Sequence, residues 1–296
     1  MTIERDVPIG PMTTYRVGGA ASWFTRVASN GDLSLAIAFR AERGLDVLVL
    51  GKGSNMLVAD AGFDGLVIVL GDDFAEIAID DTVVLAGGAA SLPVVARQTA
   101  AAGLTGFEWA VGVPGSIGGA VRMNAGGHGS DMAASVARVR VVDLASGDDG
   151  WMGPSDLAFG YRTSSIAPSQ VVVSAELQLA VGDSARSEAE IAEIVRWRRE
   201  NQPGGQNAGS VFTNPAGDSA GRLIDAAGCK GLRVGTATVS DKHANFFIAD
   251  QGGSADDVLA LMKVVRDRVY EAHGIWLHAE TRLVGFAGNP SLEVEG

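Results

Sequence analysis

The chain has 296 residues, of which 47% are hydrophobic and 20% charged, so its composition is that of a globular protein rather than a disordered one. Its 23 Lys and Arg against 35 Asp and Glu give a net charge of −12, which argues against a protein whose main task is to grip nucleic acid. The single cysteine, Cys229, excludes an intrachain disulfide and a cysteine-based zinc site. With no apolar run near the roughly 18 residues of a membrane span and a charged N-terminus, we expect a cytoplasmic protein without membrane insertion.

Residues 1–180 alternate short apolar runs with two helical segments, and glycine-rich stretches separate them. Runs of β-branched residues between turn residues are typical of strands, and a three-to-four-residue apolar spacing is typical of helices. The expected elements are a helix that Asn30 caps and Gly44 ends, strands at 46–50, 66–70 and 82–86, a helix at 91–101, and strands at 138–144 and 171–179 joined by a turn at 146–150.

The composition changes near residue 182, where a charged helical segment at 184–201 begins. A Pro/Gly loop separates it from an α/β block, for which we expect helices at 219–227 and 254–271 and a last strand at 275–284. Ser254 and Asp257 have the spacing of a capping box. The pattern predicts an α+β protein with two N-terminal subdomains and a C-terminal domain.

Glycine is unusually frequent, at 40 of 296 residues, or about twice the average usage. The first cluster, at 51–55, reads GKGSN and follows an expected strand. Its backbone N–H groups are free to face an anion, and its glycines allow close approach. It matches neither GxxxxGK[ST] nor GxGxxG, so the motif alone is a weak signal.

The second cluster, at 111–127, reads VGVPGSIGGAVRMNAGG and holds six glycines. A simple hairpin needs no such density, whereas backbone that wraps a flat ligand or a diphosphate does. The alternative is a loop that only holds two subdomains together.

Six sequence blocks together resemble one enzyme family. They are, in chain order, GKGSNMLV, VPGSIGGAVRMNAG, FGYRTS, NAGSVFTNP, KHANF and AETRLVG. The chain resembles the UDP-N-acetylenolpyruvoylglucosamine reductases of peptidoglycan precursor synthesis over residues 13–285, nearly its whole length. The first two blocks alone would indicate only the wider flavin-binding fold.

This resemblance implies a two-subdomain FAD-binding fold of the vanillyl-alcohol-oxidase (PCMH) type followed by an α/β substrate domain. The implied divisions are FAD-binding subdomains at 1–71 and 72–181, a UDP-sugar domain at 182–285 and a tail at 286–296. FAD would be held non-covalently, and NADPH would be the reductant co-substrate. The enolpyruvyl group of UDP-N-acetylglucosamine enolpyruvate would then be reduced to a lactyl ether, giving UDP-N-acetylmuramate.

The resemblance also assigns cofactor contacts to the two glycine-rich clusters. They are Gly51, Lys52, Gly53, Ser54 and Asn55 from the first, and Gly112, Pro114, Gly115, Ser116, Gly118, Gly119, Asn124, Ala125 and Gly126 from the second. His128, just past the second cluster, is expected to be structural or to line the cleft. We expect no metal site, because no His and carboxylate set has convincing ligand spacing.

Three residues match the family's catalytic positions. Hydride addition to an enolpyruvyl group leaves charge that a cation must stabilise and a carbanion that an acid must protonate. Arg162 would stabilise the enolate, since a planar guanidinium suits a carboxylate–enol system. Ser210 would donate the proton, and Glu280 would help Arg162 to polarise the substrate. The alternatives are a surface arginine, a turn-ordering serine and an exposed strand glutamate.

The expected substrate contacts follow from the charge that a nucleotide diphosphate requires. Residues 221–245 carry four Lys or Arg against two Asp, which is 4 − 2 = +2. The candidates for diphosphate or uridine contacts are Asn214, Lys242, His243 and Asn245, and a solvated mixed-charge face is the alternative for each of these four. Tyr161 is a further expected substrate contact.

Two departures from the family pattern bear on the substrate site. Thr213 stands where the family often has Lys, and no tyrosine-bearing loop separates Arg162 from Ser210, so the chain resembles the family's shorter second class. Another flavin-dependent oxidoreductase of the same fold with a different substrate, or a non-enzymatic flavin-binding relative, would also account for the N-terminal clusters. The sequence leaves the oligomeric state open.

Overall fold

The computed structural model describes residues 1–286 and divides into two compact units, each made of several chain segments. Unit 1 consists of Met1–Arg5, Trp23–Lys52 and Gly65–Arg198. Unit 2 consists of Asp6–Ser22, Gly53–Asp64 and the chain from Arg199 onward. The predicted tail at 286–296 lies outside the described residues apart from its first position. The predicted assignment of residues 1–181 to FAD binding and of residues 182–285 to UDP-sugar binding stays a prediction.

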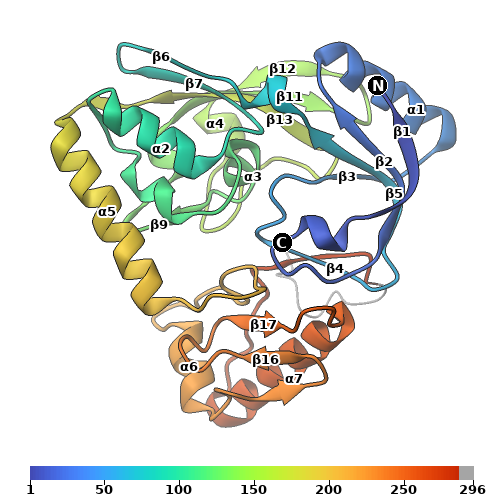
Figure 1. Ribbon diagram of the computed structural model, residues 1–296, viewed down its shortest axis with the longest axis vertical. Coiled ribbons are helices and arrows are strands. Elements are labelled where there is room, and N and C mark those ends of the chain that lie inside the picture. The colour runs from blue at the N-terminus through green and yellow to red at the C-terminus, as the bar shows by residue number, and fades with distance from the viewer. Residues whose placement is uncertain (287–296) are drawn as a thin grey trace. The chain divides into compact units, whose positions relative to one another are not determined.

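The first sheet of unit 1 has four strands in the order β1-β2-β5-β3 (Figure 1). They are β1 (Ile3–Pro8), β2 (Ala20–Val27), β5 (Phe63–Leu70) and β3 (Val47–Val49), with β3 parallel to β5. Leu33 and Ala36 of α1 (Asn30–Arg43) pack on this sheet. The N-cap lies one residue before the predicted Asn30, because the Ser29 hydroxyl accepts the Asp32 N–H, and Gly44 ends the helix at a φ of 62°.

The second sheet of unit 1 has five strands in the order β12-β11-β13-β7-β6, paired antiparallel throughout. They are β12 (Asp149–Met152), β11 (Val136–Asp143), β13 (Gln170–Gln178), β7 (Val83–Gly87) and β6 (Ile77–Asp80). The predicted direct turn between β11 and β13 is wrong, since that turn leads into β12, and α4 (Pro154–Leu157) also intervenes. Val142 of β11 and Leu144, which follows the strand, lie in one buried cluster with Leu66 and Ile68 of the first sheet, so the sheets share a core.

Helices and short strands cover the other face of the second sheet. They are α2 (Leu92–Ala101), α3 (Ile117–Arg122), α5 (Ser184–Asn201), the 3₁₀ helices at 108–112 and 132–134, and the strand pairs β8 (Leu104–Thr105) with β14 (Ala180–Val181) and β9 (Gly126–Gly127) with β10 (Ser130–Asp131). The 3₁₀ helix at 72–75 instead contributes Phe74 to the core between the two sheets. Ile191 and Ile194 of α5 are buried in this core. The helix at 184–201 therefore packs with unit 1 although its composition resembles that of a solvated helix, because its sparse apolar stripe is enough to attach it.

A buried carboxylate attaches α5 to the segment that precedes the second glycine-rich cluster. Glu108 is only 5% exposed. Its oxygens accept the Ser187 hydroxyl at 2.5 Å and the Gly106 N–H at 2.8 Å. Burial acts to raise the pKa of Glu108, but hydrogen bonds from Ser187, Thr105 and the backbone outweigh it, so the pKa lies below its ordinary value.

We expect Glu108→Gln to lower the free energy of unfolding by about 2 kcal/mol at pH 7, because a charged acceptor of buried hydrogen bonds is lost. Since the folded pKa lies below the unfolded one, this contribution is complete above the unfolded pKa of about 4.3 and disappears as the pH falls through the folded pKa. Denaturant titrations from pH 7 down to pH 3 should show the difference between the two proteins shrinking. The control is Glu176→Gln, which removes a surface ion pair with Arg138. A gap that widens towards acid pH would contradict the assignment.

Unit 2 contains a three-stranded antiparallel sheet in the order β15-β16-β17, backed by helices. The elements are β15 (Arg233–Val234), β16 (Ala237–Val239), β17 (Phe247–Ala249), α6 (Ala220–Ala226) and α7 (Ala255–His273), with the 3₁₀ helix at 10–12 and the parallel pair β4 (Met56–Val58) and β18 (Arg282–Val284). The predicted last strand is therefore much shorter, and a single bridge from Phe212 to Ala279 precedes it. Residues Tyr15, Val17 and Leu57 are buried with α6 and α7, which explains why two early segments belong to unit 2.

The start of α7 departs from the predicted capping box. The Ser254 hydroxyl accepts the Asp257 N–H as expected, but the Asp257 carboxylate accepts from Thr236 instead of returning to Ser254. Asp60 supplies the missing acceptor, because its carboxylate receives the Ser254 hydroxyl and the N–H groups of the first turn. A residue almost two hundred positions away thus completes the cap.

Candidate active site

The first glycine-rich cluster follows β3, and the division between the two units falls inside it, after Lys52. Gly53 has a φ of +60°, and a Cβ there would lie 2.6 Å from the Thr13 Cα. Its carbonyl also accepts the Thr14 N–H at 3.1 Å. Gly53 is therefore required by packing in unit 2, while Gly51 and Lys52 are exposed at the surface of unit 1.

Within unit 1, the two clusters meet at Ser116, which caps α3 but uses no side-chain hydrogen bond to do so. A Cβ at Gly51 would lie 2.8 Å from the Ser116 Oγ, and one at Gly119 would lie 3.5 Å from it. Both glycines are exposed, whereas Ser116 is buried. Bare backbone on each side of a serine hydroxyl at a helix start is suited to phosphate oxygens, so these residues fit a diphosphate-bearing cofactor such as FAD.

Gly112 and Gly118 of the second cluster serve packing in unit 1. A Cβ at Gly112 would press against Ile194 and Arg198 of α5. One at Gly118 would lie 3.1 Å from two carbonyl oxygens, those of Gly88 and Val172. The remaining predicted members lie on the same segment: Gly115 accepts the Leu92 N–H, Ala125 donates to Ala120, Gly126 belongs to β9, and Pro114 is exposed. The alternative of a structural loop therefore holds for part of the cluster.

Arg162 lies in the loop that follows α4, held by a bridge between Gly160 and Thr163. Its backbone has a φ of +57°, which is uncommon for a residue other than glycine. The Arg162 Nη2 donates to the Gly126 carbonyl at 3.0 Å, and the guanidinium lies 5.2 Å from the centre of the Tyr161 ring. Tyr161 itself is 59% exposed. Unit 1 thus places the predicted catalytic arginine directly beside the second glycine-rich cluster.

Ser210 and Glu280 are 70 positions apart in sequence but adjacent in unit 2. The Glu280 N–H donates to the Val211 carbonyl at 2.8 Å, and the bridge from Phe212 to Ala279 continues this pairing. Both predicted catalytic side chains are half-buried. Arg162 belongs to the other unit, so the structure brings together two of the three predicted catalytic residues within one compact body.

Three of the predicted substrate contacts already have partners within unit 2. The Asn214 Oδ1 accepts the Ala220 N–H at 3.0 Å, at the start of α6. The Lys242 Nζ donates to the Arg199 carbonyl at 2.7 Å. The Asn245 amide binds the Phe212 backbone and is only 2% exposed. Asn214 and Lys242 are exposed and remain accessible to a ligand, whereas Asn245 is buried.

His243 is held as a neutral donor. Burial lowers its pKa below the ordinary value, and the charge of Lys230 lowers it further, against the effect of a backbone hydrogen bond. The Asn245 N–H donates to the His243 Nδ1 at 3.2 Å, which leaves the proton on Nε2. His243 can therefore offer one N–H to a ligand but not a positive charge at pH 7.

Most of the predicted local positive charge of unit 2 is neutralised by ion pairs. Arg222 pairs with Asp218, Lys230 with Asp225, and Arg233 with Asp250. Among the four Lys and Arg residues of 221–245, Lys242 differs because its ammonium group donates to a backbone carbonyl and not to a carboxylate.

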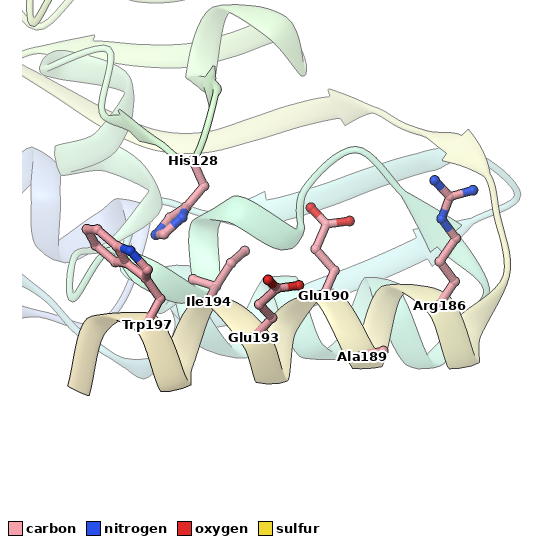
Figure 2. Close-up of a pocket in the computed structure, with 7 residues that line it drawn as sticks. All are labelled: His128, Arg186, Ala189, Glu190, Glu193, Ile194 and Trp197. Carbon is pink, nitrogen blue, oxygen red and sulfur yellow. The ribbon is translucent and has the colours of Figure 1, made fainter. Parts of the chain in front are cut away.

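A cavity of about 530 Å³ lies along α5 in unit 1. Figure 2 shows His128 facing Trp197, with the acidic side chains of Glu190 and Glu193 farther along the helix. The two rings meet edge to face with centroids 5.2 Å apart. His128 therefore lines a hollow beside the second glycine-rich cluster, and none of the predicted catalytic residues lines this cavity.

Asp131 and Glu108 are two residues near the site that the sequence reasoning missed. Asp131 accepts from the Asn124 side chain, and Glu108 attaches α5 to the segment before the second cluster. Both are acidic residues close in sequence to the second glycine-rich cluster. The sequence contains no signal that distinguishes such a residue from a carboxylate at the surface.

Within residues 1–286, no helix combines the length and the apolar character needed to cross a membrane. The same residues include no group of three or more His, Cys, Asp or Glu placed to hold a metal ion.

Comparison with known proteins agrees with this arrangement. Residues 21–148 match the family model of an FAD binding domain, and residues 201–284 match that of the UDP-N-acetylenolpyruvoylglucosamine reductase C-terminal domain. UDP-N-acetylenolpyruvoylglucosamine reductase 2 of Symbiobacterium thermophilum is 42% identical over 96% of this chain and 92% of its own. The reductase of Anaeromyxobacter dehalogenans is 45% identical over 95% of this chain and 85% of its own.

A solved structure is similar as well. The crystal structure of UDP-N-acetylenolpyruvylglucosamine reductase from Thermus caldophilus covers 96% of this chain with a TM-score of 0.84 at 37% identity, and 99% of that structure is matched. The predicted α+β class, with an FAD-binding fold followed by a separate C-terminal domain, is confirmed. The chain belongs to the UDP-N-acetylenolpyruvoylglucosamine reductase family.

Proposed function

We propose that this chain reduces UDP-N-acetylglucosamine enolpyruvate to UDP-N-acetylmuramate at the expense of NADPH, with FAD as its cofactor, in peptidoglycan precursor synthesis. The observation that carries the proposal is the 42% identity to a reductase of this name over 96% of the chain. The FAD binding domain at 21–148 and the adjacency of Ser210 and Glu280 support it.

FAD, when bound, would supply hydride for the vinyl carbon of the substrate, with NADPH as the reductant of the flavin. The protein's part is to hold the cofactor and to handle charge and protons. The exposed backbone at Gly51 and Gly119, on either side of Ser116, is suited to hold the diphosphate of FAD.

Arg162 is proposed to stabilise the enolate. Hydride addition places negative charge on the carbon next to the carboxylate, and a guanidinium can bind both oxygens of such a group at once. Its Nη2 bond to the Gly126 carbonyl and its position over Tyr161 restrict the orientation of the guanidinium. Such preorganisation is what makes a charge effective in a transition state.

Ser210 is proposed to protonate the carbanionic carbon. A hydroxyl is a weak acid, so it can act only where the neighbouring groups stabilise the alkoxide that forms. The half-buried Glu280 side chain belongs to the segment paired with that of Ser210, and we assign to it the polarisation of the enolpyruvyl group.

The UDP moiety is proposed to bind unit 2 through Asn214, Lys242 and His243. Lys242 and Asn214 are exposed, and His243 offers an Nε2–H, so the set provides one cation and neutral donors for phosphate or uracil oxygens. The exposed Tyr161 ring, in unit 1, remains a candidate for packing against the substrate.

We place the reaction in the cytoplasm, since NADPH is the reductant of that compartment. A net charge of −12 supports small molecules rather than nucleic acid as its partners.

Product analysis tests the proposed function. The flavin-loaded protein should convert UDP-N-acetylglucosamine enolpyruvate and NADPH into a compound that mass spectrometry identifies as the substrate plus two hydrogens, with one NADPH consumed per product. Consumption of NADPH without this product would contradict the assigned substrate.

A further inference from the structure

Each of the three predicted catalytic residues lies within two residues of a backbone group that an asparagine side chain binds from a distant part of its own unit. The pairs are Asn124 with the segment of Arg162, Asn245 with the segment of Ser210, and Asn55 with Glu280 itself. All three asparagines belong to motifs that the family resemblance assigns to cofactor or substrate contacts.

Asn124 is 3% exposed, and its amide group is fully used inside unit 1. Its Nδ2 donates to the Gly160 carbonyl at 2.9 Å and to the Asp131 Oδ2 at 3.1 Å, and its Oδ1 accepts the Ala133 N–H at 3.0 Å. Gly160 lies two residues before Arg162. The amide therefore ties the arginine loop to the second glycine-rich cluster.

Asn245 is 2% exposed and forms a two-point contact with one residue in unit 2. Its Oδ1 accepts the Phe212 N–H at 3.0 Å, and its Nδ2 donates to the Phe212 carbonyl at 2.8 Å. Its backbone carbonyl also accepts the Val211 N–H at 2.9 Å. Phe212 lies two residues after Ser210, so the serine segment is fixed at that point.

Asn55 provides the corresponding contact at Glu280. Its Nδ2 donates to the Glu280 carbonyl at 2.9 Å, and its own carbonyl accepts the Arg282 N–H at 3.0 Å. The first glycine-rich cluster, at its end in unit 2, therefore holds the backbone of the glutamate.

We propose that Asn124 and Asn245, with Asn55 as a third member, are positioning residues for Arg162, Ser210 and Glu280 rather than ligand contacts. The proposal rests on the proposed function for the roles of those three residues. An amide suits this task because it presents a donor and an acceptor together and carries no charge, so it can satisfy two backbone groups in a buried place. A carboxylate at the same position can accept but not donate.

The Gly160 contact of Asn124 can be isolated by exchanging two side chains. Asp131→Asn alone keeps a partner for the Asn124 Nδ2, and it serves as the matched control. Adding Asn124→Asp restores a donor–acceptor pair between positions 124 and 131 and keeps the acceptor for the Ala133 N–H. It replaces the donation to the Gly160 carbonyl by a carboxylate oxygen that faces this carbonyl, so the double variant differs from its control in the contact with the arginine loop and in the charge at position 124.

The double variant should retain FAD and be reduced by NADPH at a rate within about threefold of the control, while its reoxidation by the enolpyruvyl sugar slows by about 100-fold, the size expected of a misplaced catalytic group. The dissociation constant of the enolpyruvyl sugar for the oxidised protein, from calorimetry, should change by less than about threefold, because the expected loss is in the transition state. Loss of FAD from the double variant alone would instead make Asn124 a cofactor residue and overturn the proposal.

Asn245→Asp tests the second contact, since it keeps the acceptor for the Phe212 N–H and loses the donor to the Phe212 carbonyl. It should slow reoxidation while substrate affinity is kept; weakened substrate binding with an unchanged rate would make Asn245 a ligand contact. The control is Thr25→Val, which removes a buried hydroxyl that donates to the Thr2 carbonyl. It should lower the melting temperature without altering either half-reaction.

Hydrogen exchange separates failure of this proposal from failure of the proposed function. Mass spectrometry should show faster exchange over residues 158–164 in the double variant than in Asp131→Asn, whatever substrate the wild-type protein reduces. Unchanged exchange there, together with unchanged reoxidation, would overturn the positioning role. A wild-type protein that the enolpyruvyl sugar cannot reoxidise would overturn the proposed function while the exchange result still stands.

Discussion

Replacing Ser210 with alanine should leave reduction of the bound flavin by NADPH nearly intact and slow its reoxidation by the enolpyruvyl sugar by roughly 10²–10⁴-fold, the usual contribution of a general acid. NADPH reduction requires no proton on the substrate carbon, so only the second half-reaction depends on the hydroxyl. Stopped-flow absorbance of the flavin, with each half-reaction started separately, measures the two rates.

Ser219→Ala is the matched control for this experiment, because Ser219 is an exposed serine of the same unit that caps α6. Loss of the cap should lower stability by about 1 kcal/mol and leave both half-reactions unchanged. If Ser210→Ala instead slows both half-reactions equally, Ser210 orders its loop and another group donates the proton.

Replacing Arg162 with lysine should lower the reoxidation rate by about 10²–10³-fold, the size of effect seen when one donor to a developing oxyanion is removed. Lysine keeps the charge but loses the planar fork that can bind a carboxylate–enol at two points. It also loses the geometry that holds the guanidinium between the Gly126 carbonyl and the Tyr161 ring. Single-turnover reoxidation, measured at saturating substrate, gives this rate.

Arg140→Lys controls for the loss of a guanidinium from unit 1, since Arg140 forms a surface pair with Asp149 on the second sheet. Its half-reactions should match those of the wild-type protein. An Arg162→Lys protein that is reoxidised as fast as wild type would show that the charge alone suffices and that the bidentate geometry plays no part.

The helices were the part of the fold that the sequence predicted best. The helix at 184–201 has the predicted bounds, and α1, α2, α6 and α7 lie within a few residues of theirs, because caps such as Ser219 and Gly44 are local signals. Strand lengths were predicted less well. The last strand was predicted at 275–284, but only three residues form it. Alternating polar and apolar residues can occur in a segment that has no partner strand, so the pattern alone does not fix the length of a strand.

The candidate site illustrates the same limit. The family resemblance pointed to Ser210 and Glu280, and in the structure the Glu280 N–H donates to the carbonyl of Val211, the residue after Ser210. What sequence could not distinguish is an asparagine that binds a ligand from one that binds backbone, because both need the same amide. The use of Asn124 and Asn245 depends on tertiary contacts with Gly160 and Phe212, which are 36 and 33 positions away.

Attachment of α5 to unit 1 was also beyond sequence reasoning. Its composition is charged, and only a few buried side chains, among them Ser187 and Ile191, give it a packed face. Ser187 and Glu108 are 79 positions apart, so no local sequence pattern indicates their hydrogen bond.

The most direct test of the account is an anaerobic stopped-flow experiment on the wild-type, flavin-loaded protein. NADPH reduces the flavin in the first step, and UDP-N-acetylglucosamine enolpyruvate is then mixed with the reduced protein. We expect a rapid return of the oxidised flavin spectrum together with formation of UDP-N-acetylmuramate. A flavin that NADPH reduces but that this substrate fails to reoxidise would contradict the proposed substrate and leave only the fold and the cofactor standing.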